Sequence, residues 1–94
     1  GKKDVRIVWG MVGDKDIDTI ITLLPDNATY FLCMPSIERA MPMERMEPYF
    51  AKKNHTVHTS IMNAYKTALQ NVTDDTVVFV GGSSYVVAEF LSKK

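Results

Sequence analysis

Apolar runs and helical stripes alternate along the chain, and this alternation predicts the order of its elements. Val5–Trp9 is a short, nearly continuous apolar run that ends at Gly10, which is typical of a strand buried on both faces of a parallel sheet. Over residues 17–24, apolar side chains recur at helical spacing until Pro25, which predicts an amphipathic helix. Thr29–Cys33 is aromatic and apolar and predicts the next strand.

The middle of the chain, residues 34–53, is harder to assign because two prolines divide it. Pro42 suits the first turn of a helix, whereas Pro48 cuts or kinks whatever helix follows. Four methionines favour flexible core filling over a methionine-rich binding groove: Met34, Met41, Met43 and Met46. His55–His58 is short enough to be an edge strand. Two histidines three apart on a strand point to opposite faces, so they do not predict a metal pair.

The last third of the chain repeats the pattern more clearly. Ser60 precedes a helical stripe of apolar residues over 61–69 and can cap that helix. Thr76–Val80 is the most strand-like stretch, and it runs through Gly81–Ser84 into a final helix that extends to Leu91. Because strands alternate with helices, we predict an α/β fold in which helices cover both faces of a mostly parallel sheet.

Composition narrows the class of protein. With 94 residues, of which 46% are hydrophobic, the chain suffices for one modest domain over residues 1–94. Eleven basic residues balance eleven acidic ones, so the net basic charge typical of nucleic-acid-binding proteins is missing. No apolar run approaches the ~20 residues of a membrane span, and no signal peptide is recognisable. A lone cysteine, Cys33, suits a reducing cytoplasm, where we expect the protein to work.

Two glycine-containing segments follow predicted strands and are the candidate ligand-binding turns. The first combines Gly10 with Lys15, and the lysine is flanked by Asp14 and Asp16. A lysine beside a helix N-terminus suits an anionic group. A plain glycine turn, with the aspartates capping the helix, explains the same residues. The spacing is not that of a P-loop.

The second segment, residues 81–84, places Gly82 and the hydroxyl of Ser83 before the last helix. Free backbone N–H groups converge at such a helix start. In an open parallel sheet, ligands gather beyond the carboxyl ends of the strands. Two such turns therefore predict a shared site for a carboxylate or phosphate. No nucleophile–base constellation accompanies them, so we expect no catalysis by this chain alone.

Several segments carry a family resemblance, in order along nearly the whole chain: Gly10-Met11-Val12-Gly13-Asp14-Lys15-Asp16-Ile17, Leu23-Leu24-Pro25 with Ala28-Thr29-Tyr30-Phe31, Glu38-Arg39-Ala40, and Gly81-Gly82-Ser83-Ser84-Tyr85-Val86-Val87-Ala88. They resemble the folylpolyglutamate synthase/dihydrofolate synthase family. By this resemblance, the chain is the bulk of the C-terminal, Mur-ligase-type domain, a Rossmann-like fold that here lacks its first strand and helix.

The resemblance also implies an activity for the longer enzyme. Such ligases use ATP and Mg²⁺ to phosphorylate a carboxyl group of a folate or dihydropteroate, and the amino group of L-glutamate then attacks the acyl phosphate. The C-terminal domain helps to close the ATP site and presents glutamate, whereas the N-terminal domain holds the P-loop and most magnesium ligands. We expect a monomeric, cytoplasmic ligase, and an inactive fragment that binds neither ATP nor Mg²⁺.

The resemblance carries over to individual residues. Lys15 matches the lysine that faces the carboxylate of the amino-acid substrate, and Ser83 matches the serine assigned to glutamate binding. The other residues are expected to support the turns of the site: Gly10, Asp14, Asp16, Gly82 and Arg39. Helix capping by the aspartates and loop anchoring by the arginine stay open as alternatives. A non-catalytic Rossmann-like binding or interaction module is the alternative for the whole chain.

Overall fold

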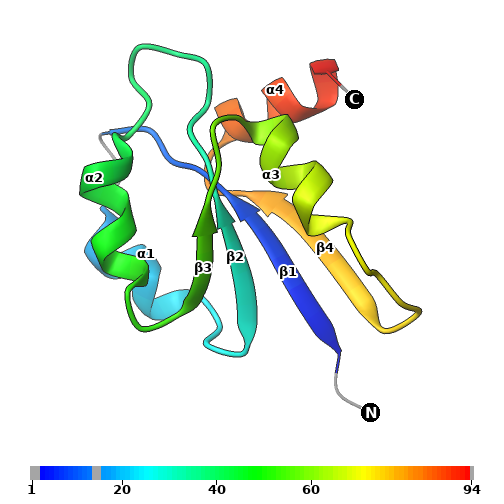
Figure 1. The fold of residues 1–94 in the computed structure, drawn as a ribbon. Helices are drawn as coiled ribbons and strands as arrows, with labels where there is room; N and C mark the ends of the chain where they lie inside the picture. Colours follow the sequence, from blue (N-terminus) through cyan, green and yellow to red (C-terminus); the bar gives the residue numbers. More distant parts are fainter. Residues whose placement is uncertain (1–2, 14–15, 94) are drawn as a thin grey trace.

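Four parallel strands form one sheet, and helices pack on both of its faces (Figure 1). The structure, a computed structural model, describes residues 3–13 and 16–93. The strands lie in the order β3-β2-β1-β4, with bounds β1 Asp4–Trp9, β2 Ala28–Leu32, β3 Asn54–Val57 and β4 Thr76–Gly81. The helices are α1 Ile17–Leu23, α2 Met43–Met46, the 3-10 helix η1 Glu47–Phe50, α3 Ile61–Ala68 and α4 Ser84–Lys93. The predicted α/β class and element order are confirmed.

One face of the sheet is covered by α1, α2 and η1. Ile7 of β1 lies opposite Tyr30 of β2. Both side chains are buried together with Ile17, Met46 and Phe50 from the covering helices. The apolar residues of α1 recur at helical spacing, which is why one side of this helix enters the core while its polar side faces solvent.

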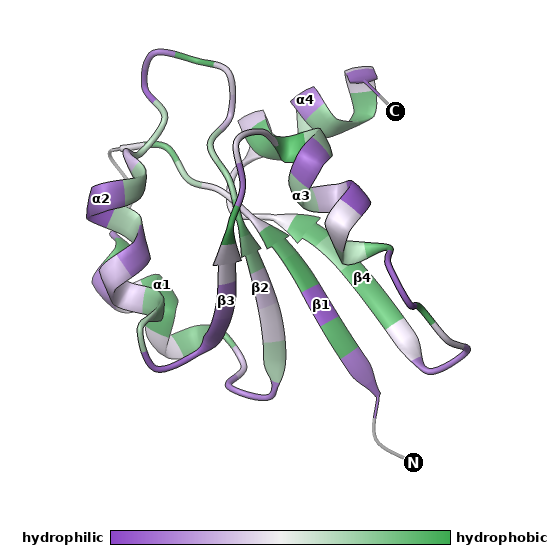
Figure 2. Ribbon diagram, in the orientation of Figure 1, coloured by the Kyte–Doolittle hydropathy of each residue, from purple (hydrophilic) through white to green (hydrophobic). Residues whose placement is uncertain are grey.

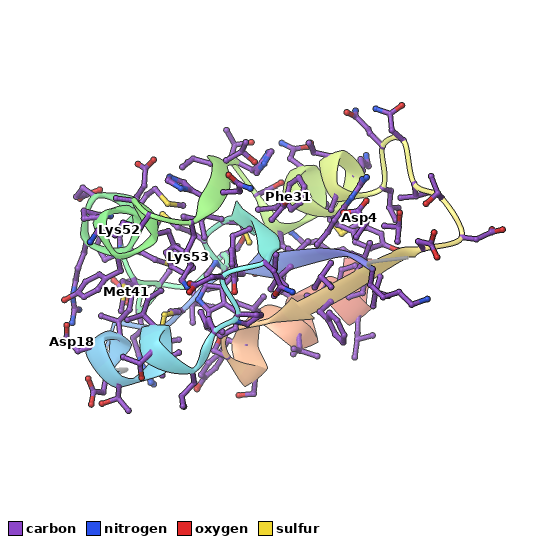
Figure 3. All side chains as sticks on the ribbon, turned by 90° about the horizontal axis from the view of Figure 1, so that it is seen from below. Asp4, Asp18, Phe31, Met41, Lys52 and Lys53 are labelled. Carbon is purple, nitrogen blue, oxygen red and sulfur yellow. The ribbon has the colours of Figure 1, made fainter. Side chains whose placement is uncertain are left out.

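The opposite face is covered by α3 and α4. Val8 and Phe31, the next pair in register, are buried with Ile61 and Val86. Figure 3 shows Phe31 on the side of the sheet that faces α3 and Met41 on the other side. Successive residues of a strand point to opposite faces, so β1 and β2 contribute to two separate cores.

Two prolines determine where the helices between β2 and β3 begin. Pro42 is the N-cap of α2, and Pro48 lies in the first turn of η1, so a four-residue helix passes into a 3-10 turn. Met41 and Met46 are fully buried, as the core-filling prediction requires, whereas Met34 is 36% exposed. The methionines therefore do not line a shared groove.

The histidines of the β3 segment lie on opposite faces, as the sequence predicts. The Nε2 of His55 lies 3.0 Å from a carboxylate oxygen of Glu47 in η1, and its Nδ1 lies 3.0 Å from the carbonyl oxygen of Lys53. His58 instead stacks on Phe31, with ring centroids 5.7 Å apart, toward the α3 side.

Arg6, in the middle of β1, satisfies the end of α3. Its Nη1 donates to the carbonyl oxygens of Ala68, at 2.9 Å, and Gln70. Asp4 accepts from the same guanidinium at 2.8 Å, and this hydrogen bond lowers the pKa of the Asp4 carboxyl. Carbonyls at a helix C-terminus have no partner within the helix, so the strand provides one.

The two edges of the sheet differ in character. β3 is short, and three of its four residues are exposed. β4 is nearly all apolar, and Figure 2 shows it as a mostly hydrophobic strand at the edge opposite the more hydrophilic β3. Phe79 of β4 lies opposite the buried Ile7, yet it is 55% exposed. Across the described ranges, no helix is long and apolar enough to cross a membrane.

Candidate functional site

The turns after β1 and β4 contact each other at the carboxyl edge of the sheet. The N–H of Gly10 donates to the carbonyl oxygen of Gly81 at 3.3 Å. Gly82 has a φ of 109°, a region that favours glycine, and a Cβ there would lie 1.8 Å from the carbonyl oxygen of Gly10. A Cβ on Gly10 would lie 2.7 Å from the carbonyl oxygen of Cys33. Glycine at position 82 therefore lets the turns after β1 and β4 meet, and glycine at position 10 lets the segment after β2 approach the same edge.

Ser83 completes the second turn and caps α4. Its Oγ accepts a hydrogen bond from the N–H of Val86 at 3.2 Å, and its carbonyl oxygen accepts from the N–H of Val87 at 3.2 Å. A hydroxyl that accepts one hydrogen bond can still donate its own proton. The cap therefore leaves a donor beside the electropositive start of a ten-residue helix.

Asp16 caps α1, which was one of the two roles left open for it. Its carboxylate accepts from the N–H of Thr19 at 3.3 Å and from the Thr19 hydroxyl at 2.7 Å. These hydrogen bonds lower the pKa of the Asp16 carboxyl. Asp14 and Lys15, the latter the main predicted glutamate ligand, lie outside the described residues.

The segment after β2 runs beside the loop after β1. The N–H of Gly13 donates to the carbonyl oxygen of Arg39 at 2.7 Å, and the N–H of Met41 donates to that of Met11 at 2.8 Å. A surface hollow of about 370 Å³ opens where the two segments meet. It is lined by Gly13, Glu38, Arg39, Ala40 and Pro42.

Arg39 extends from this hollow toward α4. The centre of its guanidinium lies 5.5 Å from the ring centroid of Tyr85, in the first turn of that helix. A cation over an aromatic face at this distance is attracted by the ring. Arg39 thus anchors its segment, which was one of its two predicted roles, and it also borders the hollow.

Two further residues of this edge were not predicted from the sequence. Arg45 donates to the carbonyl oxygen of Gly13 at 2.6 Å. Glu89 accepts from the N–H of Ser36 at 2.6 Å and from its hydroxyl at 2.9 Å. The partners are 32 and 53 residues apart along the chain, so no local pattern could have paired them.

The described residues offer binding groups rather than reactive ones. Cys33 is fully buried, and burial raises the pKa of its thiol to about 12, so the reactive thiolate is disfavoured. Within residues 3–13 and 16–93, no three His, Cys, Asp or Glu side chains are grouped so that they could hold a metal ion.

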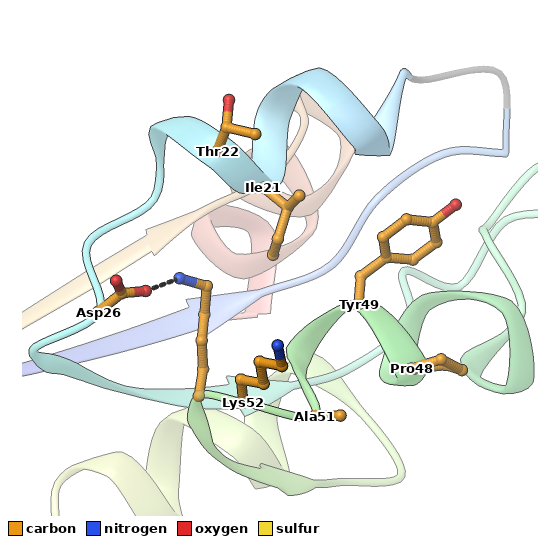
Figure 4. A pocket seen from close by; sticks show the side chains of 8 residues that line it. Ile21, Thr22, Asp26, Pro48, Tyr49, Ala51 and Lys52 are labelled. Atoms are coloured by element: carbon orange, nitrogen blue, oxygen red, sulfur yellow. Dashed lines mark hydrogen bonds and ion pairs between the residues drawn. The ribbon is translucent and has the colours of Figure 1, made fainter.

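A second pocket, of about 410 Å³, lies between α1 and η1, near the residues that precede β2 and β3 (Figure 4). It contains none of the predicted site residues. Its buried cation is compensated within the pocket, because Lys53, whose side chain is 8% exposed, pairs with Asp26. It is lined by Ile21, Thr22, Asp26, Pro48, Tyr49, Ala51, Lys52 and Lys53.

Two curated proteins are similar to this chain in sequence. A scan against models of known protein families found no match. The chain is 33% identical, over 89 residues, to a probable bifunctional folylpolyglutamate synthase/dihydropteroate synthase of Haloferax volcanii, with 92% of this chain and 11% of that protein covered. It is also 33% identical, over 91 residues, to a dihydrofolate synthase/folylpolyglutamate synthase of Buchnera aphidicola, with 96% and 22% covered.

Solved structures of the same kind of enzyme share the fold of this chain. A bifunctional folylpolyglutamate synthase/dihydrofolate synthase of Yersinia pestis, complexed with AMPPNP and a Mn ion, superposes with a TM-score of 0.85 at 23% identity, over 97% of this chain and 22% of that one. E. coli FolC in complex with DHPP and ADP gives 0.78 at 20% identity, over 99% and 22%. The homologues of this chain are thus folylpolyglutamate and dihydrofolate synthases, and it corresponds to a single α/β segment of these ligases.

Proposed function

We propose that these 94 residues are most of the C-terminal, Mur-ligase-type domain of a folylpolyglutamate/dihydrofolate synthase, and that the domain binds L-glutamate and helps to close the ATP site. The observation that carries this proposal is the contact between the turns at Gly10 and Gly82, in a chain whose homologues are these ligases. The contact brings the loop after β1 and the start of α4 to one edge, where ligands of parallel sheets bind.

The chemistry of glutamate suits this edge. Backbone N–H groups at the start of α4 and the hydroxyl of Ser83 are donors for a carboxylate. Lys15 supplies the positive charge that the family resemblance assigns to it. With its carboxylate held in this way, glutamate directs its amino group at the acyl phosphate of the folate or dihydropteroate. The new C–N bond forms as phosphate leaves.

ATP, Mg²⁺ and the folate belong mainly to another domain in this proposal. The sequence has no P-loop, and the part of the chain that the structure describes groups no three candidate metal ligands. The described residues therefore do not fit a metal site by themselves. We propose accordingly that the 94 residues alone neither hydrolyse ATP nor form the amide bond.

The unequal edges of the sheet support a larger domain. Strands that are apolar along their whole length are typical of sheet interiors, and natural outer strands are short or polar. β3 fits an outer position, whereas β4, with Phe79 55% exposed, does not. We propose that a further strand and helix of a longer polypeptide cover β4.

Substitution of the two predicted glutamate ligands tests the proposal, in a ligase polypeptide that joins this segment to its P-loop domain. Lys15→Ala is expected to raise the KM for glutamate about tenfold to a hundredfold, because a charged hydrogen bond contributes roughly 1.5–3 kcal/mol. The KM for ATP should change little, because only binding of the second substrate is removed. Ser83→Ala should act in the same direction and more weakly, since a neutral donor is lost.

Lys66→Ala, which changes an exposed lysine of α3, is the matched control and should alter neither constant. The thermal transition of Lys15→Ala should stay within a few degrees of the parent. A lowered transition with an unchanged KM for glutamate would assign Lys15 a structural role and contradict the proposed site.

A further inference from the structure

We propose that Glu89 is a positioning residue that holds the two halves of the candidate site at a fixed spacing. The inference rests on the proposed glutamate site and concerns residues 36–41, which we term the strap. The strap follows β2, and Figure 1 shows its segment rising beyond the carboxyl ends of the strands. It contacts both the loop after β1 and helix α4, the element that Ser83 caps.

Backbone contacts join the strap to the loop after β1. They are the hydrogen bonds Gly13 N–H to Arg39 O (2.7 Å) and Met41 N–H to Met11 O (2.8 Å), and the antiparallel bridge between Val12 and Ala40. Met11, Val12 and Met41 are almost completely buried at the same place. Main-chain pairs on buried anchors leave little freedom, so the strap and this loop move as one unit.

Side chains join the strap to α4. The side chain of Glu89 is only 12% exposed, and its carboxylate accepts from both the N–H and the hydroxyl of Ser36. Hydrogen bonds to an ionised acceptor are about twice as strong as neutral ones. Arg39 over the ring of Tyr85 adds a second link one helical turn earlier. Tyr85 lies in the first turn of α4, close to Ser83, and Glu89 lies in the middle of the same helix.

The loop after β1 and helix α4 are therefore connected at two places around the site. At its base, the loop and the second turn touch directly, because the N–H of Gly10 donates to Gly81. The strap joins the same two parts a second time, through Glu89. Without this carboxylate, α4 could tilt about the Gly10 contact, and Ser83 would shift relative to the loop that leads to Lys15. A carboxylate that needs donors from both sides would then be bound more weakly.

Amide hydrogen exchange and glutamate titration of the 94-residue chain, both followed by NMR, test this inference. In Glu89→Ala, we expect faster exchange at the N–H of Gly13 and of Met41, which Glu89 does not touch, and an approximately tenfold higher dissociation constant for L-glutamate. Glu89→Gln should restore both, because an amide can still pair with the N–H and the hydroxyl of Ser36. Glu44→Ala, at an exposed glutamate of α2, is the matched control.

Tyr85→Leu provides a second variant if Glu89→Ala fails to fold, since Tyr85 is 45% exposed, and it should cause the same changes at a smaller scale. Unchanged exchange at Gly13 in both variants would overturn the inference, whatever glutamate does. Faster exchange with an unchanged glutamate constant would overturn it as well. A parent chain that shows no glutamate-dependent shift at high concentration, but the expected exchange pattern, would contradict the proposed function and leave the strap in place.

Discussion

Gly81 and Gly82 are neighbours in the sequence, yet the fold requires glycine at only one of them. Gly82 has φ at 109°, and a Cβ on it would meet the carbonyl oxygen of Gly10 at 1.8 Å. A Cβ on Gly81 would meet only the ring of Trp9, at an ordinary 3.6 Å. The close approach of two backbones therefore requires glycine at position 82. At position 81 the structure has room for a side chain.

This difference gives a paired prediction. Gly82→Ala should lower the free energy of unfolding by about 3 kcal/mol or more, because backbone strain and a clash with main-chain atoms act together. Gly81→Ala should change it by less than about 1 kcal/mol. Chemical denaturation of the two variants measures both values. Equal losses would mean that the turns do not touch as described.

His55 makes the stability of the chain depend on pH. The hydrogen bond to the carbonyl of Lys53, followed by that to Glu47, raises the pKa of His55 in the folded state, because the imidazolium donates at both nitrogens. A raised folded pKa gives stability that is complete below the unfolded value of about 6.5 and is lost as pH rises through the folded value.

His55→Gln should therefore cost the most stability near about pH 5.5 and progressively less toward about pH 8.5. The comparison must be made against the parent at each pH. Burial lowers the pKa of His58, so the contribution of His58 to stability increases as pH rises. This contribution is the same in the parent and in the variant. A difference between parent and variant that stays constant over this range would mean that His55 is not held as the charged form.

At the scale of elements, β1, β2 and β4 could be predicted to within a residue because each is a short apolar run between turn residues, as Val5–Trp9 and Thr76–Val80 illustrate. The cap at Ser60 could be predicted from the residues next to it, and for the first helix the sequence offered Asp14 or Asp16, of which Asp16 is the cap. The pairing of Glu89 with Ser36 could not, since it depends on how α4 packs against a loop that lies 53 residues away.

At the end of α3, a side chain of strand β1 provides the hydrogen-bond donor that the helix lacks. Arg6 contributes its guanidinium to carbonyls that α3 leaves unpaired, and its side chain is only 14% exposed. Arg6→Leu should lower the free energy of unfolding by about 1–3 kcal/mol, because the carbonyls at the end of α3 lose their donor. Arg6→Lys should recover part of this loss, since an ammonium reaches fewer acceptors than the planar guanidinium.

Lys52→Leu, at an exposed lysine of the segment before β3, is the control for the loss of a cation and should be nearly neutral. Thermal melts of the three variants, followed by circular dichroism, distinguish the cases. Equal effects of Arg6→Leu and Lys52→Leu would show that net charge, rather than the satisfied carbonyls, determines the change.

At the scale of the molecule, the meeting of the turns at Gly10 and Gly82 could be predicted because parallel strands end at one edge of the sheet. The sequence indicated one outer strand, His55–His58, which the sheet order confirms as β3, but it did not indicate that β4 is the other. An apolar run such as Thr76–Val80 reads as interior in any sheet, and the strand order leaves its outer side open in the described part of the chain. The hollow beside Arg39 likewise depends on tertiary contacts that no spacing encodes.

That open edge predicts the behaviour of the isolated chain in solution. Exposed apolar strands without charges or prolines pair with further strands, so the 94-residue chain should self-associate through β4 as its concentration rises. Phe79→Lys should weaken this association, because it places a charge on a side chain that is 55% exposed at the free edge. Val57→Lys, at a 45% exposed residue of β3 on the opposite edge, should leave it unchanged. Sedimentation velocity over a concentration series measures the effect.

Two outcomes would contradict this prediction. A parent that stays monomeric up to about 1 mM, where even weak association becomes visible, would show that β4 needs no covering strand. Equal effects of the two variants would show that association does not depend on the β4 edge.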